Sequence, residues 1–390
     1  MIADFVHEHR GCEIVYGRGA VGRLGHLLAA RGLERALVVC GARVGANDAV
    51  IEPVRRGLGG RLVGVFDGTT PEKSAEAVFA GIERMRRGGA DVLVGLGGGS
   101  SLDVARQISV FAADGRSLGE LRDAARRGPL DRPVDRGATE VVVIPTTLAG
   151  ADLSAGGSVE VLPAHDSPTG DPVRVGGSAM PTAAVYDPDL FETTPAGPLL
   201  GSAMNGLDKG IETLYARDAS PVSDAPAIHG VRLLRSALPR LDDAGAMEAA
   251  VAGVLLVQLQ RKIGIVHAFG HGLSHRYDVQ QGLAHAVLVP HVLSYLLGKV
   301  DGRRDLLAVA LGVDPAPPTP EALAEAIVGS VAGLRDALGL PDRLRDLGPV
   351  AEADLPAIAA YVRDDPPTAR GPEGLEPTVD ELEGVLRAAW

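Results

Sequence analysis

Short apolar runs alternate with amphipathic stretches over the first part of the chain. Each run holds four to six residues, most of them aliphatic, which is typical of a strand buried on both faces of a sheet. These runs predict strands at residues 36–40, 61–66, 91–96 and 141–144. The segments with helical spacing between them are residues 44–58 and 73–87. This alternation predicts a parallel sheet with helices on both faces.

The pattern changes after Pro195, where apolar positions recur every three or four residues over long stretches. This period is that of a helix, so the second part of the chain is predicted to be all helical. Helices are predicted at residues 197–217, 223–240, 244–262, 281–297, 303–311, 319–338 and 376–389. Residues 161–181 are rich in Pro, Asp, Ser and Gly, which indicates a loop or hairpin between the two parts.

These patterns predict two domains with a cleft between them. A chain of 390 residues is long for one average domain. We expect an α/β domain at residues 1–160, an interdomain hairpin or linker at 161–190, and a helical domain at 191–390.

The run Gly97-Gly98-Gly99-Ser100 directly follows the predicted strand at 91–96. Glycines without a Cβ let the backbone approach a pyrophosphate, and the helix that follows offers unpaired N–H groups and the positive end of its dipole. The segment therefore predicts dinucleotide binding. Its spacing differs from G-x-G-x-x-G, and a tight strand-to-helix turn is the alternative explanation.

Composition narrows the class of protein further. The formal net charge of −12 argues against a nucleic-acid partner, which needs a basic face. The longest apolar stretches are too short to span a bilayer, and the N-terminus lacks the basic start and apolar core of an export signal. Two cysteines cannot form a disulfide framework. We therefore expect a cytoplasmic protein without a membrane or nucleic-acid partner.

Several short segments spread along the chain carry a joint signature. They are Val15–Gly19, Gly97–Asp103, Pro145–Thr147, Val185–Leu190, Asn205–Tyr215, Gly264–His271, Gly374–Val379 and Arg387–Trp390. In this order they resemble the iron-containing alcohol dehydrogenase superfamily and, within it, the maleylacetate reductase-like branch. The resemblance implies the dehydroquinate synthase-like fold of that superfamily, an NAD(P)-binding N-terminal domain, a helical C-terminal domain, and hydride transfer at the cleft between them.

The resemblance also assigns cofactor-binding roles to residues of the first domain. These residues are Gly97, Gly98, Gly99, Ser100, Asp103, Thr146 and Thr147. The glycines and the serine would hold the pyrophosphate, and the two threonines would contact the cofactor. Asp103 would lie at the start of the helix below the pyrophosphate. An acid near a helix start is also favoured by the helix dipole alone, so Asp103 has a structural explanation as well.

One position bears on the choice between NAD and NADP. NAD-preferring relatives place an acidic residue just after the strand equivalent to 36–40, where its carboxylate binds the ribose hydroxyls. This chain has Gly41 there and Arg43 two residues further on. The missing carboxylate removes repulsion against a 2′-phosphate, and an arginine can pair with it. Gly41 is therefore predicted to line a site for NAD or NADP, with NADP tolerated unless Arg43 points to solvent.

The chain departs from the metal site that the resemblance implies. Relatives that use a metal bind it through an Asp and a His one helical turn apart, followed by two further histidines. The corresponding residues here are Asn205, Lys209, His267 and Gln281. The anionic ligand is missing, and a lysine ammonium offers protons where a divalent cation needs lone pairs. No catalytic metal is therefore expected.

The sequence contains two other groups of residues that bear on metal binding. Asp208 is next to Lys209 but about 100° round the helix, so it is not expected to replace the lost carboxylate. His271, His275 and His285 could form a different site. Histidines at this spacing more commonly line a polar cleft.

Lys209 is the candidate for the electrostatic role of the metal. In metal-dependent relatives the ion stabilises the alkoxide from which hydride leaves. An ammonium at that place could stabilise the alkoxide or hold a substrate carboxylate. A salt bridge to Asp208 or Glu212 on the same helix is the structural alternative. His271, which matches a family position near the nicotinamide, is the candidate proton relay, and His267 is the second candidate.

The substrate pocket is expected to differ from that of relatives as well. Relatives often continue the Pro-Thr-Thr segment with Gly-Ser-Glu or Gly-Thr-Gly-Ser-Glu, whereas this chain reads LAGADLSA over residues 148–155. Asp152 in this segment, Asn205 and Gln281 are the expected pocket residues. The changes in the pocket wall and the metal site together indicate a specialised substrate.

These features predict a metal-independent, NAD(P)-dependent dehydrogenase or reductase that interconverts a secondary alcohol and a ketone on a carboxylate-bearing substrate, such as a hydroxy acid. Three alternatives stay open: a peptide-tailoring dehydrogenase of daptide type, which would oxidatively decarboxylate a C-terminal threonine; a maleylacetate reductase-like reductase; and a non-catalytic nucleotide-binding family member. The expected partners are a small molecule or a peptide C-terminus. Family members are commonly dimers or larger, so a homo-oligomer is expected.

Overall fold

The computed structural model of the chain describes residues 11–133, 137–314 and 319–390. These residues divide into two compact units. Of the described residues, the α/β unit takes in those from 11 to 147 together with 151–194, and the helical unit takes in 148–150 together with those from 195 to 390. The chain therefore leaves the α/β unit for three residues and returns to it before it enters the long helical part.

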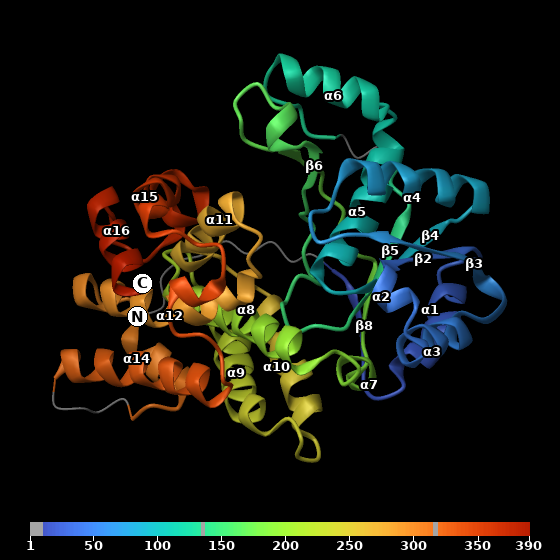
Figure 1. Cartoon of the computed structure of the whole chain (residues 1–390). Coiled ribbons are helices and arrows are strands. Elements are labelled where there is room, and N and C mark those ends of the chain that lie inside the picture. The colour runs from blue at the N-terminus through green and yellow to red at the C-terminus, as the bar shows by residue number, and fades with distance from the viewer. Residues whose placement is uncertain (1–10, 134–136, 315–318) are drawn as a thin grey trace. The chain divides into compact units, whose positions relative to one another are not determined.

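A six-stranded sheet forms the centre of the α/β unit (Figure 1). Its strand order is β1-β8-β5-β4-β2-β3, and all neighbouring strands are parallel. The strands are β1 (Glu13–Tyr16), β2 (Ala36–Gly41), β3 (Leu62–Thr69), β4 (Val92–Gly97), β5 (Glu140–Pro145) and β8 (Ala183–Tyr186). The strands predicted from the apolar runs correspond to β2, β3, β4 and β5, so the predicted parallel sheet is confirmed.

Helices cover both faces of this sheet. They are α1 (Leu24–Ala29), α3 (Asp48–Leu58), α4 (Ala75–Gly88) and α5 (Gly99–Asp114). The first two share one apolar core with alternate residues of the central strands, including Val38 and Val94. The other two pack on the opposite face, where α5 lies against β4 and β5. Because side chains of a strand alternate between faces, strands buried on both sides need the continuous apolar runs found here.

Smaller elements complete the α/β unit. They are α2 (Ala42–Gly45), α6 (Leu118–Arg127), α7 (Pro188–Phe191), β6 (Val159–Leu162) and β7 (Val173–Val175). The last two form an antiparallel hairpin in the region where a loop or hairpin was expected. The apolar pattern does not predict α6, which is rich in charged residues. Its capping box, formed by Ser117 and Glu120, is the sequence signal that marks its start.

The helical unit is built around α8, which is buried on all sides from Gly201 to Tyr215. It packs against α9, α10 and α12. The helices are α8 (Ala196–Tyr215), α9 (Pro221–Ala237), α10 (Ala246–Gln258), α11 (Ile265–Arg276), α12 (Gln281–Lys299), α13 (Arg304–Leu311), α14 (Pro320–Ala337), α15 (Leu355–Asp364) and α16 (Val379–Ala388). The predicted fold class, an α/β unit followed by an all-helical unit, is confirmed.

The apolar periodicity does not predict α11 and α15. Glycines and histidines interrupt the apolar repeat of α11. Packing of these two helices against each other stabilises them, and a local pattern does not contain that information. Within the described ranges, no helix is both long and apolar enough to cross a bilayer.

Candidate functional site

The glycine turn forms the junction between β4 and α5. Gly97 ends β4 with a φ of 127°, a value that favours glycine, and its carbonyl accepts a hydrogen bond from the Thr146 N–H at 3.0 Å. Gly98 is the N-cap of α5, and among the described residues no side chain caps this helix and no acid lies in its first turn. Exposed N–H groups at a helix start bind anions, so the arrangement fits a pyrophosphate site.

Asp103 lies one turn into α5 and is engaged in ion pairs. Its Oδ2 lies 3.0 Å from Lys73 Nζ, and its Oδ1 lies 2.8 Å from Arg106 NH2. Arg106 is fully buried and also donates to the carbonyls of Ala151 at 2.9 Å and Asp152 at 3.3 Å. Asp152 itself is 2% exposed. Asp103 therefore holds Arg106, and Arg106 holds the loop that contains the predicted pocket residue Asp152.

The end of β2 has room for a side chain. A Cβ on Gly41 would meet the Thr69 carbonyl at 3.4 Å, an ordinary contact, and its φ of −84° is allowed for any residue. Arg43 is exposed in α2. Asp67 lies close to the same turn, because a Cβ on Gly45 would be 3.0 Å from its Cβ. A guanidinium and a carboxylate therefore both lie near the expected ribose position.

Three of the residues at the family's metal positions form one hydrogen-bonded chain. Lys209 Nζ donates to Asn205 Oδ1 at 2.8 Å and to the Ala149 carbonyl at 2.5 Å. Asn205 Nδ2 in turn donates to Gln281 Oε1 at 3.3 Å. Lys209 and Asn205 are 5% and 7% exposed and lie one turn apart on α8. The ammonium is therefore a buried cation with fixed polar partners.

The segment Leu148–Gly150 packs directly on α8. Gly206 on this helix leaves no room for a side chain, because a Cβ there would be 2.3 Å from the Leu148 carbonyl oxygen. This close approach brings the Ala149 carbonyl to Lys209. The loop and Lys209, at which the chain is expected to differ from its relatives, are thus in direct contact. The sequence could not reveal Ala149 as a site residue, because its contribution is a backbone carbonyl.

Glu212 holds His267 at the start of α11. It is fully buried and accepts hydrogen bonds from the N–H groups of Gly264 at 2.8 Å and Val266 at 2.7 Å, and from Tyr215 Oη at 3.0 Å. His267 Nδ1 lies 2.5 Å from Glu212 Oε2. Burial raises the pKa of Glu212 to about 7, although these donors act against that shift. When the carboxylate is ionised it only accepts, so His267 then carries its proton on Nδ1 and its lone pair on Nε2.

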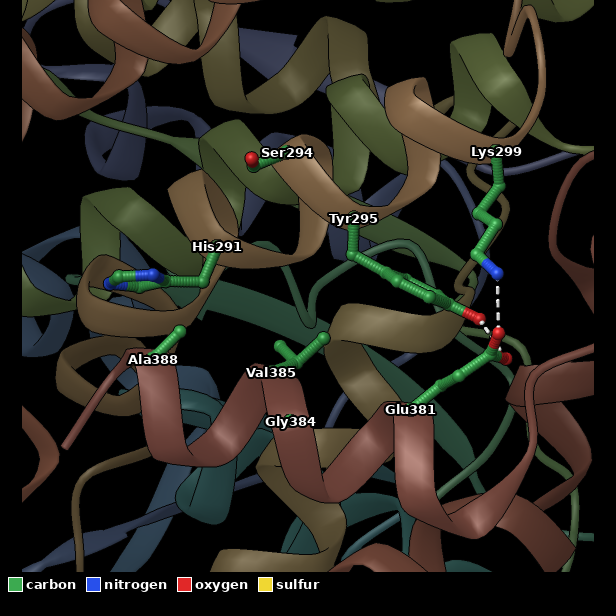
Figure 2. Close-up of a pocket in the computed structure, with 8 residues that line it drawn as sticks. All are labelled: His291, Ser294, Tyr295, Lys299, Glu381, Gly384, Val385 and Ala388. Carbon is green, nitrogen blue, oxygen red and sulfur yellow. Dashed lines mark hydrogen bonds and ion pairs between the residues drawn. The ribbon is translucent and has the colours of Figure 1, made fainter.

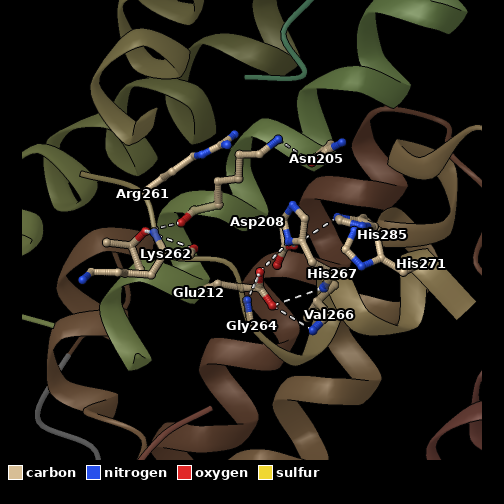
Figure 3. A network of polar contacts seen from close by, with 12 residues as sticks. Asn205, Asp208, Glu212, Arg261, Lys262, Gly264, Val266, His267, His271 and His285 are labelled. Carbon is tan, nitrogen blue, oxygen red and sulfur yellow. Dashed lines mark hydrogen bonds and ion pairs between the residues drawn. The ribbon is translucent and has the colours of Figure 1, made fainter. Parts of the chain in front are cut away.

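Asp208 belongs to the same buried cluster, which α8, α11 and α12 form together (Figure 3). Its Oδ2 lies 3.1 Å from His267 Nδ1 and 3.0 Å from His285 Nδ1. Burial, with the nearby charge of Glu212, raises the pKa of Asp208 to about 7. Burial also lowers the pKa values of His267 and His285. The pKa values of the Asp208 and Glu212 carboxyls are therefore both raised to about 7.

The family's metal positions do not fit a divalent cation in this chain. The Lys209 ammonium lies among them, hydrogen-bonded to Asn205, and His267 is the one strong ligand left. A different group, formed by Asp208, His267 and His285, has donor atoms within 4.8 Å of one another, and the described residues contain no other group of this kind. Glu212 occupies Nδ1 of His267. Both carboxylate oxygens of Asp208, Nε2 of His267 and both ring nitrogens of His285 are buried without a hydrogen-bond partner in the described structure.

His271 and His275 follow His267 at one-turn intervals along α11, but they have other partners. His271 Nδ1 lies 2.7 Å from Asp365 Oδ2. The His275 ring stacks on Tyr361, with centroids 5.0 Å apart. The His271 side chain is 36% exposed, against 5% for His267. In the described structure the three histidines therefore have three separate environments.

A separate hollow of about 360 Å³ lies between α12 and α16 (Figure 2). Inside it, Tyr295 Oη and Lys299 Nζ donate to Glu381 at 2.9 and 2.5 Å. Glu381 also accepts from the Thr378 N–H in the capping box of α16. The ammonium of Lys299 and these other donors lower the pKa of Glu381 to about 2. These contacts join α16 to α12, and no predicted site residue lines the hollow.

The glycine turn at the end of a parallel strand and the buried polar cluster on α8 are features of a nucleotide-dependent oxidoreductase. The chain belongs to the iron-containing alcohol dehydrogenase family: the model of that family matches residues 12–188, and the model of its C-terminal part matches residues 200–390. This is a family of NAD-dependent alcohol and aldehyde oxidoreductases, so the resemblance inferred from the sequence is confirmed.

Relatives of known activity cover almost the whole chain. The NAD-dependent methanol dehydrogenase of Bacillus methanolicus is 29% identical over 96% of this chain and 97% of its own. The 1,3-propanediol dehydrogenase of Citrobacter freundii is 31% identical over 88% of this chain and 89% of its own. The maleylacetate reductase of Pseudomonas knackmussii is 27% identical over 99% of this chain and 98% of its own. A solved 1,3-propanediol oxidoreductase superposes with a TM-score of 0.86 at 24% identity, over 100% of both chains. The substrates named in these relatives differ.

Proposed function

We propose that this protein is a metal-independent, NAD(P)-dependent oxidoreductase that interconverts a secondary alcohol and a ketone on a carboxylate-bearing substrate. The observation that supports this proposal is the buried Lys209 ammonium, held by Asn205 and the Ala149 carbonyl at a metal-ligand position of the family. A fixed positive charge there stabilises the negative charge that develops on the substrate oxygen.

In the proposed reaction, the nicotinamide, the side chains of Lys209 and His271, and the amide side chains of Asn205 and Gln281 have different roles. The bound nicotinamide supplies the hydride acceptor. Lys209 stabilises the alkoxide that forms when the substrate hydroxyl loses its proton, and His271 accepts that proton. Asn205 and Gln281 offer neutral amide groups to the substrate beside the ammonium. The same cationic centre favours a substrate with a carboxylate close to the hydroxyl, as in a hydroxy acid.

A substrate panel tests the reaction class through the absorbance of the reduced nicotinamide. The panel holds hydroxy acids, the matching simple alcohols, maleylacetate and a peptide that ends in threonine. The proposal requires turnover of hydroxy acids above that of the simple alcohols. Nucleotide binding without any turnover would support a non-catalytic family member instead.

Chelation tests metal independence. We expect kcat of the native protein to be unchanged after treatment with EDTA, because an ammonium supplies the positive charge. The matched control is the triple variant Asn205→Asp, Lys209→His and Gln281→His, which restores the family's ligand set around His267. This variant should bind a divalent cation and lose it to EDTA, as measured by metal analysis. If EDTA abolishes native activity and added zinc or iron restores it, the lysine model is wrong.

Gly41→Asp tests the cofactor site. A carboxylate at this position has room, can bind ribose hydroxyls and repels a 2′-phosphate. We expect the ratio of kcat/KM for NADP to that for NAD to fall by about 10-fold or more. Arg43→Ala should lower kcat/KM for NADP alone, while Arg56→Ala, at an exposed position on α3, should change neither value. An unchanged ratio in Gly41→Asp would mean that the ribose binds elsewhere.

A further inference from the structure

We propose that Asp365 is a positioning residue for His271. Its carboxylate fixes the ring with the proton on Nδ1, so that Nε2 carries the lone pair that accepts the substrate proton. The inference rests on the proposed function, because it assigns an orienting group to the proton acceptor of that reaction. The pair is defined by the 2.7 Å distance between His271 Nδ1 and Asp365 Oδ2.

The backbone of Asp365 is held on both sides. Its N–H donates to the Tyr361 carbonyl at 3.0 Å at the end of α15, and its carbonyl accepts from the Thr368 N–H at 2.9 Å. It is the N-cap of the short 3₁₀ helix Pro366–Arg370, which begins with two prolines. Its side chain is 11% exposed. A carboxylate held in this way is positioned before any substrate binds, which keeps the ordering cost of the pair low.

The helix that carries His271 is held just as firmly against α15. Gly272, the next residue, lies so close to that helix that a Cβ on it would be 3.1 Å from Ile358 Cγ2. The distance between His271 and Asp365 is therefore set by the packing of α11 on α15. Two side chains on a rigid pair of helices keep a hydrogen bond better than two side chains on loops do.

Comparison with His267 shows why His271 is the group that exchanges protons. Both rings have a carboxylate on Nδ1, Glu212 for His267 and Asp365 for His271. The two rings, which Figure 3 shows on the same helix, have centroids 6.5 Å apart. The His267 side chain is 5% exposed and lies within the buried cluster, whereas that of His271 is 36% exposed. Only the more exposed ring can pass a proton to water directly. Its tautomer therefore matters most for turnover.

The test begins with Asp365→Asn. The amide of asparagine can donate to His271 Nδ1 and so move the ring proton to Nε2, which removes the base from the reacting side. We expect kcat to fall about 10- to 100-fold, with the dissociation constant for the cofactor unchanged. Asp365→Glu should recover most of the lost activity. The matched control is Asp364→Asn, because this neighbouring acid is exposed, and it should behave as the native protein does.

Two further measurements separate positioning from simple destabilisation. Nitrogen-15 spectra of histidine-labelled protein should show His271 with its proton on Nδ1 in the native chain and on Nε2 in Asp365→Asn. In a His271→Asn background, Asp365→Asn should cause no further loss of kcat, because the two residues act as one unit. A native His271 protonated on Nε2, or additive losses in the double variant, would overturn the inference.

The nitrogen-15 result does not depend on the substrate or on Lys209. If the Lys209 proposal fails, the tautomer of His271 still decides the role of Asp365. If the tautomer is fixed as proposed but the kcat of Asp365→Asn stays within about twofold of the native value, the positioning role in catalysis is wrong while the proposed function stands.

Discussion

Lys209→Met is expected to lower kcat by about 10³-fold or more, since the loss of a single uncharged oxyanion donor already costs about 10²- to 10³-fold. Methionine keeps most of the volume of the lysine side chain but carries no charge. The alkoxide would then face the Asn205 and Ala149 oxygens, which now accept hydrogen bonds from the ammonium. Those two acceptors would repel the developing negative charge, so the variant should be impaired in hydride transfer itself.

Single-turnover measurements distinguish this loss from weak binding. The dissociation constant for the reduced nicotinamide should stay at its native value, because the glycine turn lies in the other unit. Lys262→Met is the matched control: its Nζ pairs with Asp218 at 2.6 Å, and its side chain is 28% exposed. If Lys209→Met keeps more than about a tenth of the native kcat, Lys209 does not replace the metal.

Asp208→Asn is expected to change the pH dependence of stability. Burial raises the pKa of Asp208 from 3.8 to about 7. Between these values the folded protein keeps a proton that the unfolded chain has lost. The stabilisation from this group is therefore fully present below the unfolded pKa and is lost as the pH rises through the folded pKa. Asparagine does not titrate, so the variant should gain stability relative to the native protein between about pH 4 and pH 7.

The size of the stability gain in Asp208→Asn follows from the shift in the pKa of Asp208. Roughly three pKa units at about 1.4 kcal/mol each set an upper value of about 4 kcal/mol, which the other groups of the cluster reduce. His267 and His285 have lowered pKa values, so their contributions are lost as the pH falls through the usual histidine range. These contributions are present in both proteins. Because Asp208 interacts with Glu212 and His267, the difference between the variant and the native chain contains the loss of the Asp208 carboxyl and the change that this loss causes in the titration of its neighbours.

Fluorescence of Trp390 provides the measurement. It is the one tryptophan of the chain and lies in the helical unit, so its emission reports on the unit that contains Asp208. Urea unfolding midpoints of both proteins should diverge as the pH rises and become parallel above about pH 7.5. A difference that is constant across this range would show that Asp208 is ionised in the folded protein throughout.

Several features of the fold could be predicted from the sequence because they depend on neighbours along the chain. The apolar runs predicted strands β2 to β5, and the 3.6-residue period predicted α8 and most of the later helices. The glycine turn was also visible, since Gly97 and Gly98 must follow a strand and start a helix. By contrast, α11 and α15 depend on packing against each other, and periodicity did not reveal them. The homo-oligomer, the cytoplasmic location and the cleft stay predictions.

The sequence by itself determined the family and the order of the elements, and it led to the prediction that Asn205, Lys209 and Gln281 replace the metal ligands. Only the tertiary structure decided what surrounds the remaining polar groups. Asp365 reaches His271 across 94 positions of sequence, and the Ala149 carbonyl reaches Lys209 across 60. Such contacts arise when helices pack and backbones approach, and a backbone carbonyl has no side chain to mark it in the sequence. The identities of the site residues are therefore local information, whereas their partners are set by packing.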